Sequence, residues 1–397
     1  MTDVDVEVIV IGAGPAGSTA ALFLARSGID VLLVDRHQFP RSKVCGDALI
    51  PDAIDMLKNI GLYDSVYKEG FSLSQFRIIA PNGDSILLNG SFITIKRILF
   101  DNLLCNAAIS AGAKSAWNYS FENCIYENSK YKVEFHDNLN NKHYITSKYL
   151  IVATGANPLP LKNLGLLKYL RPTAIGIRRY VKAANTFEQE LIFSYEKFLL
   201  PGYAWIFPLG NGTYNVGCGL FLHRNNNRIN LHDLYNRFVT ESPIARQVLS
   251  TAEEQSFLEG APLWTGFMGS LVGNGSILVA GEALGLTYPT TGEGIGKCMK
   301  SGELVAKAII AHRDEGYCRP ASDLYQNLLD KEIKSKYLPY IISQKWLKYP
   351  FVPNMVVKQA NKNESIRKLL EGILKEEVEP SRILSLWGLI KVMLRIT

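Results

Sequence analysis

The chain has 397 residues, of which 47% are hydrophobic and 20% charged, and its formal net charge is +6. This length allows two or three domains, and the composition predicts a folded globular protein and excludes a disordered one. The six cysteines and six histidines show no CxxC, HExxH or similar spacing, so we expect reduced thiols and no metal site.

The chain begins with a pattern typical of a dinucleotide-binding unit. A nearly unbroken β-branched run over residues 6–11 predicts a strand that is buried on both faces of a parallel sheet. A GxGxxG turn follows and opens a helix; its members are Gly12, Gly14, Pro15, Ala16 and Gly17. The glycines allow a tight turn, a close approach to a pyrophosphate and close helix–strand packing. The phosphates are then expected at the N-terminus of the helix, where free N–H groups favour anions.

An acidic residue ends the second strand of this unit. The strand is predicted over residues 31–34, and Asp35 follows it, eighteen residues after Gly17. A carboxylate at this distance typically accepts hydrogen bonds from both ribose hydroxyls and repels a 2′-phosphate. The residues before the first strand are acidic where a signal peptide needs basic ones, so the sequence predicts a cytoplasmic protein.

The segment after Asp35 alternates between loops and short elements. Residues 37–51 contain prolines and a glycine and predict a surface or site loop. Pro51 opens a short helix that Gly61 closes. We expect a hairpin at 76–88, around Pro-Asn-Gly-Asp, and a helix over 98–111 just after Arg97.

The middle of the chain is rich in predicted strands. Residues 126–133 and 144–152 are two of them, and the second ends at Thr154-Gly155, where open α/β sheets bind ligands. Further strands at 174–181, 190–194, 204–208 and 213–220 predict an antiparallel sheet that forms a second layer. No second strand–GxGxxG–helix unit is present, so a separate nicotinamide domain is not expected.

The last part of the chain is predicted to be mostly helical. Helices are expected at 229–249 and 303–313, and from residue 323 onward with interruptions at Pro339, Pro350 and Pro353. Residues 331–397 hold 13 Lys and Arg against 6 Asp and Glu, interleaved with aromatic residues. This mixture suits a membrane surface, an acidic partner or a solvated helical face. No recognition motif accompanies the charge, so nucleic acid is not an expected partner.

The final segment, residues 383–396, is amphipathic when read as a helix. Its non-apolar residues recur every three or four positions and form a narrow basic stripe. It is therefore either the last core helix or a helix on a membrane surface. No apolar run approaches the roughly 20 residues that a membrane span needs.

Several motifs together resemble the geranylgeranyl reductase family of FAD-dependent oxidoreductases, a class that also holds aromatic hydroxylases and flavin-dependent halogenases. They are GAGPAGS at 12–18, PRSKVCG at 40–46, Arg97 with Phe100-Asp101, YAWIFP at 203–208, GEALG at 281–285 and TGEGI at 291–295. The resemblance runs from residue 6 to about 310. It implies an α/β fold with a Rossmann-like FAD-binding domain of the glutathione-reductase type, an interleaved antiparallel-sheet substrate domain and a helical C-terminal tail.

The domain boundaries follow from combining this resemblance with the predicted elements. The FAD-binding domain is expected to be discontinuous, over residues 1–75, 98–160 and 270–325. The substrate domain is expected over 76–97 and 161–269. A basic helical region is expected over 326–397.

By resemblance the dinucleotide is FAD, with Asp35 on the adenosine ribose and Arg97 near the cofactor. The apolar segment 276–280 leads into the first late glycine motif and Gly292 opens the second, which implies a second set of free amides for the polar edge of the flavin. The cofactor-binding residues that the resemblance implies are Gly12, Gly14, Pro15, Ala16, Gly17, Asp35, Arg36, Cys45, Gly46, Arg97, Thr154, Gly155, Gly281, Glu282, Gly292, Gly294 and Ile295.

Four residues are candidates for a catalytic role. Tyr203, Trp205 and Phe207 alternate along a predicted strand, so they fall on one face. That face suits an apolar substrate, as in the family, although aromatic residues at this spacing also pack in cores. Cys45 precedes Gly46, where the family has a Cys-Gly pair near the isoalloxazine. It is either a shaper of the flavin face or a proton donor, or else a small buried side chain.

Two departures from the family pattern bear on the reaction. Glu282 stands where many relatives have aspartate, and Ala153-Thr154-Gly155 stands where aromatic hydroxylases have an Asp-Gly pair that touches flavin and nicotinamide. The electron donor is therefore left open between NAD(P)H and a separate reductase or ferredoxin.

The predicted function is reduction of an isolated C=C bond in a prenyl-type or other apolar substrate. The alternative is a flavin-dependent monooxygenase or halogenase that acts on a small natural-product intermediate. A nucleotide-dependent binding protein is least favoured, because it would need neither both flavin-cradling motifs nor an aromatic face. Peripheral membrane contact through the basic tail is a further expectation.

Overall fold

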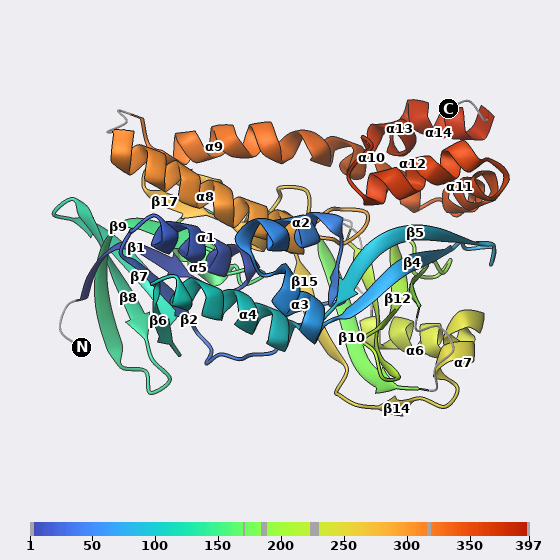
Figure 1. The fold of residues 1–397 in the computed structure, drawn as a ribbon, viewed down its shortest axis with the longest axis horizontal. Coiled ribbons are helices and arrows are strands. Elements are labelled where there is room, and N and C mark those ends of the chain that lie inside the picture. The colour runs from blue at the N-terminus through green and yellow to red at the C-terminus, as the bar shows by residue number, and fades with distance from the viewer. Residues whose placement is uncertain (1–3, 170, 184–188, 223–229, 316–318, 395–397) are drawn as a thin grey trace.

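The structure is a computed structural model that describes residues 4–169, 171–183, 189–222, 230–315 and 319–394. Two β-sheets lie along the long axis of the molecule (Figure 1). Helices α8 and α9 run over the first sheet, and the C-terminal helices lie over the second. The chain therefore has the predicted mixed α/β fold with two sheets and a helical C-terminal region.

The first sheet is centred on the strand that precedes the glycine-rich turn. β1 pairs in parallel with both β2 and β9, so its apolar side chains are buried on both faces. Among the described residues this sheet comprises β1 (Val4–Ile11), β2 (Val31–Asp35), β6 (Lys114–Trp117), β7 (Ser120–Glu127), β8 (Lys130–His136), β9 (Lys142–Val152), β16 (Gly273–Asn274) and β17 (Ile277–Val279). The predicted single strand over 126–133 is wrong, because Asn128 and Ser129 adopt positive φ and form the turn between β7 and β8.

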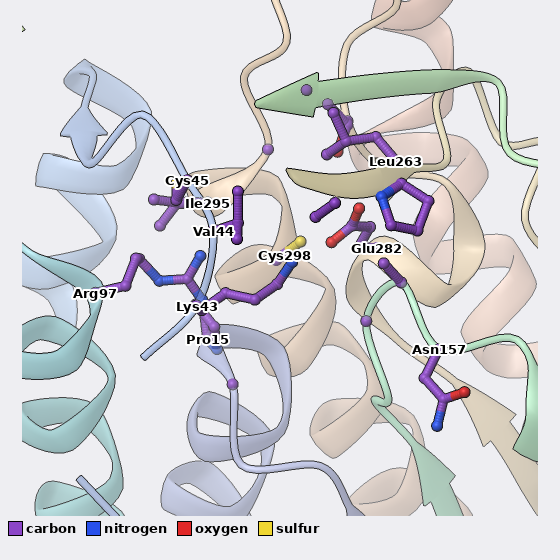
Figure 2. Close-up of a pocket in the computed structure, with 18 of the residues that line it drawn as sticks. Pro15, Lys43, Val44, Cys45, Arg97, Asn157, Leu263, Glu282, Ile295 and Cys298 are labelled. Atoms are coloured by element: carbon purple, nitrogen blue, oxygen red, sulfur yellow. The ribbon is translucent and has the colours of Figure 1, made fainter. Parts of the chain in front are cut away.

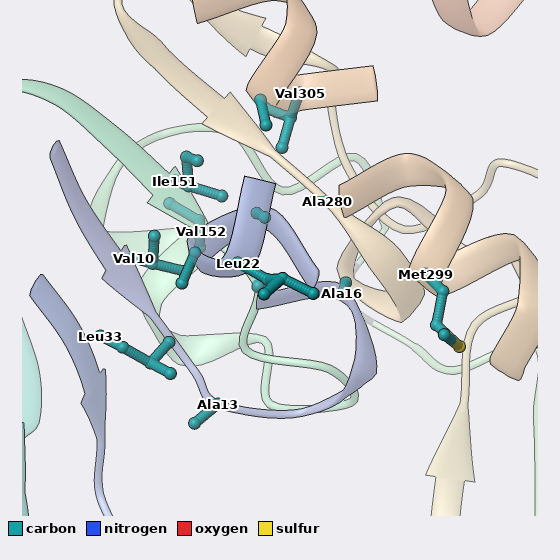
Figure 3. Packing of buried hydrophobic residues seen from close by; sticks show 14 of the residues in the cluster. Val10, Ala13, Ala16, Leu22, Leu33, Ile151, Val152, Ala280, Met299 and Val305 are labelled. Carbon is teal, nitrogen blue, oxygen red and sulfur yellow. The ribbon is translucent and has the colours of Figure 1, made fainter. Parts of the chain in front are cut away.

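Helices cover the first sheet and form the main core with it. Figure 3 shows Val10, Leu33, Ile151 and Val152 of the strands next to Leu22 of α1 and Val305 of α8. The backbones of α1 and α8 come very close, because a Cβ on Gly302 would lie 2.3 Å from the Ala16 carbonyl oxygen. The helices of this part are α1 (Pro15–Arg26), α2 (Pro51–Ile60), α3 (Tyr63–Glu69), α4 (Arg97–Ser110), α5 (Leu159–Asn163), η1 (Gly281–Leu284), α8 (Ile295–Glu315) and α9 (Ala321–Glu332).

The second sheet contains the predicted run of strands. Its strands are β3 (Ala48–Leu49), β4 (Phe71–Ile79), β5 (Ser85–Thr94), β10 (Ala174–Lys182), β11 (Glu190–Ser194), β12 (Gly202–Pro208), β13 (Thr213–Phe221), β14 (Glu253–Glu254) and β15 (Glu259–Leu263). All of its pairings are antiparallel except that of β11 with β4. The domain boundaries given above stay predictions; β3 and the start of β4 lie within the segment 1–75.

Two helices pack on the far side of the second sheet. They are α6 (Leu231–Glu241) and α7 (Pro243–Leu249), and a single helix over 229–249 was the prediction. That prediction is wrong, because Ser242 is extended and Pro243 starts a new helix in which its missing N–H is not needed. Residue 229 lies outside the described residues.

The C-terminal helices form a layer above the second sheet (Figure 1). They are η2 (Lys334–Lys336), α10 (Tyr337–Leu347), α11 (Phe351–Lys362), α12 (Glu364–Leu374), α13 (Ser381–Leu384) and α14 (Leu386–Leu394). The predicted interruption at Pro350 is confirmed, because Pro350 lies between α10 and α11 and caps α11. Those at Pro339 and Pro353 are wrong, because these prolines lie in the first turns of α10 and α11. No described helix is both long enough and apolar enough to cross a membrane.

The final segment packs into the core in part. Ile383 and Val392 are buried in the same hydrophobic cluster as Trp205 and Phe207. The segment bends at Ser385, where α13 ends and α14 begins, so it is not one continuous helix. The predicted helix extended to residue 396, and residues 395–397 lie outside the described part of the chain.

Candidate active site

One large cavity is lined by residues of both sheets. Its volume is about 770 Å³, within the range of pockets that hold cofactors and other small molecules. It is lined by every predicted catalytic residue and by every predicted cofactor residue except Gly17 and Gly281. Those two glycines lie just behind the lining: a Cβ on Gly17 would lie 1.8 Å from the Gly12 carbonyl oxygen, and one on Gly281 would lie 2.7 Å from the Ala16 Cβ.

The glycine-rich turn leaves helix α1 open at its N-terminus. Gly12 has φ +101°, and a Cβ there would lie 2.3 Å from the carbonyl oxygen of Ala153, so only glycine fits. Gly14 caps α1 without a side-chain hydrogen bond, and the first turn carries no acidic residue. The free N–H groups of this turn can therefore bind a phosphate.

Asp35 is fixed at the end of β2. Its Oδ2 accepts a hydrogen bond from the Ala13 N–H at 2.9 Å, and its Oδ1 accepts one from the His37 N–H at 2.9 Å. Each carboxylate oxygen has a second acceptor position, so the group can still bind ribose hydroxyls. Arg41 Nε lies 3.6 Å from Asp35, and its Nη1 lies 3.2 Å from Asp101. Arg41 lines the cavity, and the sequence analysis did not select it as a site residue.

Arg97 is a buried cation beside the Cys45 loop. It donates to both oxygens of Asp101, at 2.6 and 2.9 Å, and it also interacts with Cys45. Burial acts to lower the pKa of Arg97, but the Asp101 carboxylate and Cys45 hold that pKa above its ordinary value. Arg97 is therefore a permanent positive charge at the cavity wall.

An asparagine connects the Cys45 loop to the second sheet. Asn215 Nδ2 donates to the Cys45 carbonyl at 2.7 Å and to Asp47 Oδ2 at 2.8 Å. Asn215 Oδ1 in turn accepts from Trp205 Nε1 at 2.9 Å, and Tyr180 donates to Asp47 Oδ2 at 2.7 Å. Burial raises the pKa of Asp47 to about 6, against the two bonds that it accepts. Asp47 and Asn215 were not predicted as site residues; for Asn215 the signal was a polar residue inside the apolar run of β13.

The three predicted aromatic residues share one wall of the cavity. The rings of Tyr203 and Trp205 have centroids 6.1 Å apart, and those of Trp205 and Phe207 are 6.2 Å apart. The Trp205 indole lies on Gly217, where a Cβ would be 2.3 Å from its Cζ2. Trp205 and Phe207 are buried as well as lining the cavity, so the core and substrate-face interpretations both apply.

The first late motif contributes an acid and a thiol to the cavity. Glu282 and Cys298 lie next to each other (Figure 2). Glu282 Oε1 is buried and has no hydrogen-bond partner among the described residues, so it is free to accept from a ligand hydroxyl. Burial, and then Glu282, raise the pKa of Cys298 to about 12, so this thiol stays protonated. The sequence analysis missed Cys298, which lies one turn into α8.

The second late motif contributes a carboxyl group with an unusual pKa. Glu293 lines the cavity, and burial, followed by the charges of Asp52 and Glu376, raises its pKa to about 8. Glu293 belongs to the TGEGI motif, but the sequence does not reveal its role, because Asp52 and Glu376 are far away along the chain.

These features fit FAD. The free amides of α1 suit its pyrophosphate, Asp35 suits a ribose, and the unpartnered Glu282 oxygen suits a hydroxyl of its ribitol. Basic groups surround the same cavity; they are Arg36, Arg41, Lys43 and Arg97. An anionic dinucleotide therefore meets both hydrogen-bond donors and positive charge along the cavity.

Comparisons with known proteins agree with this geometry. A family model described as FAD binding domain matches residues 5–176, and one described as geranylgeranyl reductase catalytic domain matches 178–254. The chain is 31% identical to a menaquinone reductase of Mycobacterium tuberculosis, over 77% of each chain. It is 25% identical to digeranylgeranylglycerophospholipid reductase 2 of Methanopyrus kandleri, over 94% of this chain and 91% of that one. It is 29% identical to conditioned medium factor receptor 1 of Dictyostelium discoideum, covering 77% of this chain but only 63% of that longer protein.

Solved structures share the fold. A geranylgeranyl bacteriochlorophyll reductase-like protein of Thermoplasma acidophilum superposes with a TM-score of 0.78 at 22% identity, over 98% of this chain and 96% of that one. A flavin-dependent brominase superposes with a TM-score of 0.75 at 19% identity, over 96% and 97%. At these identities the likeness concerns the fold alone.

Proposed function

The chain belongs to the geranylgeranyl reductase family of FAD-dependent oxidoreductases, and on that premise we propose that it reduces an isolated C=C bond of a prenyl-type lipid. FAD is its cofactor. The observation that carries the proposal is the aromatic wall of Tyr203, Trp205 and Phe207, which belongs to the same cavity as the FAD-binding residues. An apolar chain can lie on this wall and reach the cofactor without passing through water.

The names of the relatives support a lipid substrate. Menaquinone and digeranylgeranylglycerophospholipid both carry prenyl chains, and the proteins named for them are reductases. The brominase is similar at only 19% identity, so halogenation and hydroxylation have weaker support. The electron donor is NAD(P)H, a separate reductase or a ferredoxin.

Different residues of the chain have different roles in this reaction. When bound and reduced, FAD supplies a hydride to one carbon of the double bond. The aromatic wall orients the alkene and excludes water, which controls the supply of protons. A side chain of the cavity protonates the other carbon, and Cys45, held by Asn215, is the candidate that the sequence indicates.

The test is anaerobic. The bound FAD is reduced chemically, a prenyl lipid or a small aromatic compound is added without oxygen, and reoxidation of the flavin is followed. We expect reoxidation by the prenyl lipid and a product that has gained two hydrogens, whereas the fully saturated lipid, as control, leaves the flavin reduced. If the flavin stays reduced until oxygen enters, and the product then carries oxygen or halogen, the protein is an oxygen-dependent enzyme instead.

A further inference from the structure

The turn that carries Glu293 is fixed against one end of the aromatic wall. The Glu293 carbonyl accepts from the Tyr288 N–H at 2.8 Å, and the Gly292 N–H donates to the Tyr288 carbonyl at 3.1 Å. The Tyr203 hydroxyl donates to the carbonyl oxygen of Thr291. A Cβ on Gly292, at φ +72°, would lie 2.7 Å from the same hydroxyl, so the turn touches Tyr203 directly. The Cys45–Gly46 loop lies at the other end of the wall, because a Cβ on Gly46 would be 3.2 Å from a ring carbon of Phe207.

A cluster of buried charges lies behind Glu293. Lys297 Nζ lies 2.8 Å from Asp52 Oδ2 and also pairs with Glu376. The carboxylates of Asp52 and Glu376 therefore place negative charge close to Glu293. Burial and this charge raise the pKa of Glu293 to about 8, so its carboxyl is mostly protonated at neutral pH.

Charged and titratable groups face Glu293 from several elements. They are Asp52 of α2, Tyr195 after β11, Tyr203 of β12, Tyr288 before the turn, Lys297 of α8, Tyr340 of α10 and Glu376 after α12. Burial raises the pKa of each of these tyrosines, so all of them stay neutral. Asp52, Lys297 and Glu376 are therefore the charges that set the state of Glu293.

We propose that Glu293, in place of Cys45, is the acid that protonates the second carbon of the double bond; this role rests on the proposed reduction. The O–H bond of the carboxyl breaks and its electron pair stays on Glu293 as a carboxylate. The proton forms a new C–H bond with the π electrons of the alkene, and the hydride from reduced FAD forms the other. The alkene gains two electrons and two hydrogens, and FAD is oxidised.

The surroundings also stabilise the acid after it has given up its proton. Lys297 stabilises the carboxylate that is left, and it is paired with Glu376, whose Oε2 lies 3.2 Å from Lys336 Nζ. Burial acts to lower the pKa of Lys297, but Asp52 and Glu376 hold that pKa above its ordinary value, so Lys297 stays a cation near Glu293.

Single-turnover kinetics with a prenyl lipid test the role. Glu293→Gln keeps the shape of the side chain and removes the acid, so we expect flavin reoxidation to slow by about 100-fold while FAD stays bound. Glu364→Gln, which changes an exposed glutamate of α12 outside the cavity, is the control and should react at close to the unmodified rate. The unmodified rate should fall as pH rises through about 8. Glu376→Gln should move that fall to lower pH, because the loss of a negative charge lowers the pKa of Glu293.

A spectroscopic readout is independent of turnover. The infrared band of a protonated carboxyl group should be present in the oxidised holoenzyme at neutral pH, disappear above pH 8 and be absent from Glu293→Gln. A Glu293→Gln variant that reduces the alkene at the full rate overturns the role of Glu293 and leaves the proposed function intact. An unmodified protein that reduces no alkene overturns both.

Discussion

At the scale of single residues, the adenosine end of the site depends on Asp35. Its carboxylate holds the turn through Ala13 and is positioned to accept ribose hydroxyls. We expect Asp35→Ala to lose about 1.5–3 kcal/mol of FAD binding, or about 10- to 150-fold in Kd, which is typical of a charge-assisted hydrogen bond. Titration of the apoprotein with FAD measures this. The matched control is Asp30→Ala, whose exposed ion pair with Lys114 is far weaker. Equal affinities for both variants would contradict the assignment.

A glycine under the Trp205 indole sets the position of the aromatic wall. A Cβ on Gly217 would lie 2.3 Å from the indole and 2.4 Å from the Ile177 carbonyl oxygen. We therefore expect Gly217→Ala to destabilise the protein by about 1–3 kcal/mol through overpacking. Gly260→Ala, on β15, is the control, because its nearest neighbour would be 3.4 Å away. Thermal unfolding of the two holoproteins measures the difference in stability. Equal Tm values for the two variants would mean that the Trp205 indole can move away from residue 217 without a cost in stability.

At the scale of elements, the final segment formed by α13 and α14 has an inner and an outer face. Ile383 and Val392 are buried, whereas Leu386 is 55% and Trp387 71% exposed. We propose that these two exposed residues, with the basic charge of the C-terminal region, contact an anionic membrane. Removal of residues 381–397 would uncover the core, so the more specific variant is Leu386→Ser with Trp387→Ser.

We expect this double variant to sediment less with anionic vesicles than the unmodified protein does. The control is Leu139→Ser, which is 82% exposed between β8 and β9, and equal sedimentation of all three proteins would exclude this surface.

The elements that sequence predicts well are those with a local signal. The strand, glycine turn, helix and Asp35 of residues 6–35 are all close in the chain, and each residue has one clear steric or hydrogen-bonding reason. Pro339 and Pro353 were read as interruptions because a proline in the first turn of a helix looks like one in its interior until the start of the helix is known. The turn at Asn128-Ser129 was missed although four polar residues, 127–130, interrupt the apolar pattern there.

The part of the site that sequence could not predict depends on distant contacts. The raised pKa of Glu293 comes from burial and from Asp52 and Glu376, which only the fold brings near it. Asn215 is likewise an ordinary strand residue until β13 places it against Cys45 and Asp47. Composition and spacing cannot reveal groups whose chemistry is created by packing.

At the scale of the whole molecule, Lys297 of α8 joins the C-terminal helices to helix α2. It pairs with Asp52 of α2 and with Glu376, and its side chain is only 7% exposed. Lys297→Met leaves the largely buried Asp52 carboxylate without a cation and leaves Glu376 with Lys336 alone, so we expect a loss of about 3–5 kcal/mol of unfolding free energy near pH 8. The loss should be smaller near pH 5, where the raised pKa of Asp52, due first to burial, lets it take up a proton.

Denaturant titrations at both pH values measure this effect. The control is Lys300→Met on the same helix, because the ion pairs of Lys300 with Glu303 and Glu332 are more exposed. If the loss of unfolding free energy for Lys297→Met matched that of the control, or did not change with pH, the carboxylates would not depend on Lys297 for their stability in the folded protein.

The cavity is built from residues between Ile11 and Cys298, and this has a consequence for how the protein is made. During synthesis on the ribosome, β1 and β2 emerge first, but β1 finds its other neighbour only when β9 emerges, and β9 finds β17 only after residue 279. Pairings between such distant segments form slowly. FAD therefore joins a chain whose synthesis is well advanced, and a nascent chain that stops before α8 carries the nucleotide-binding turn without a finished cavity around it.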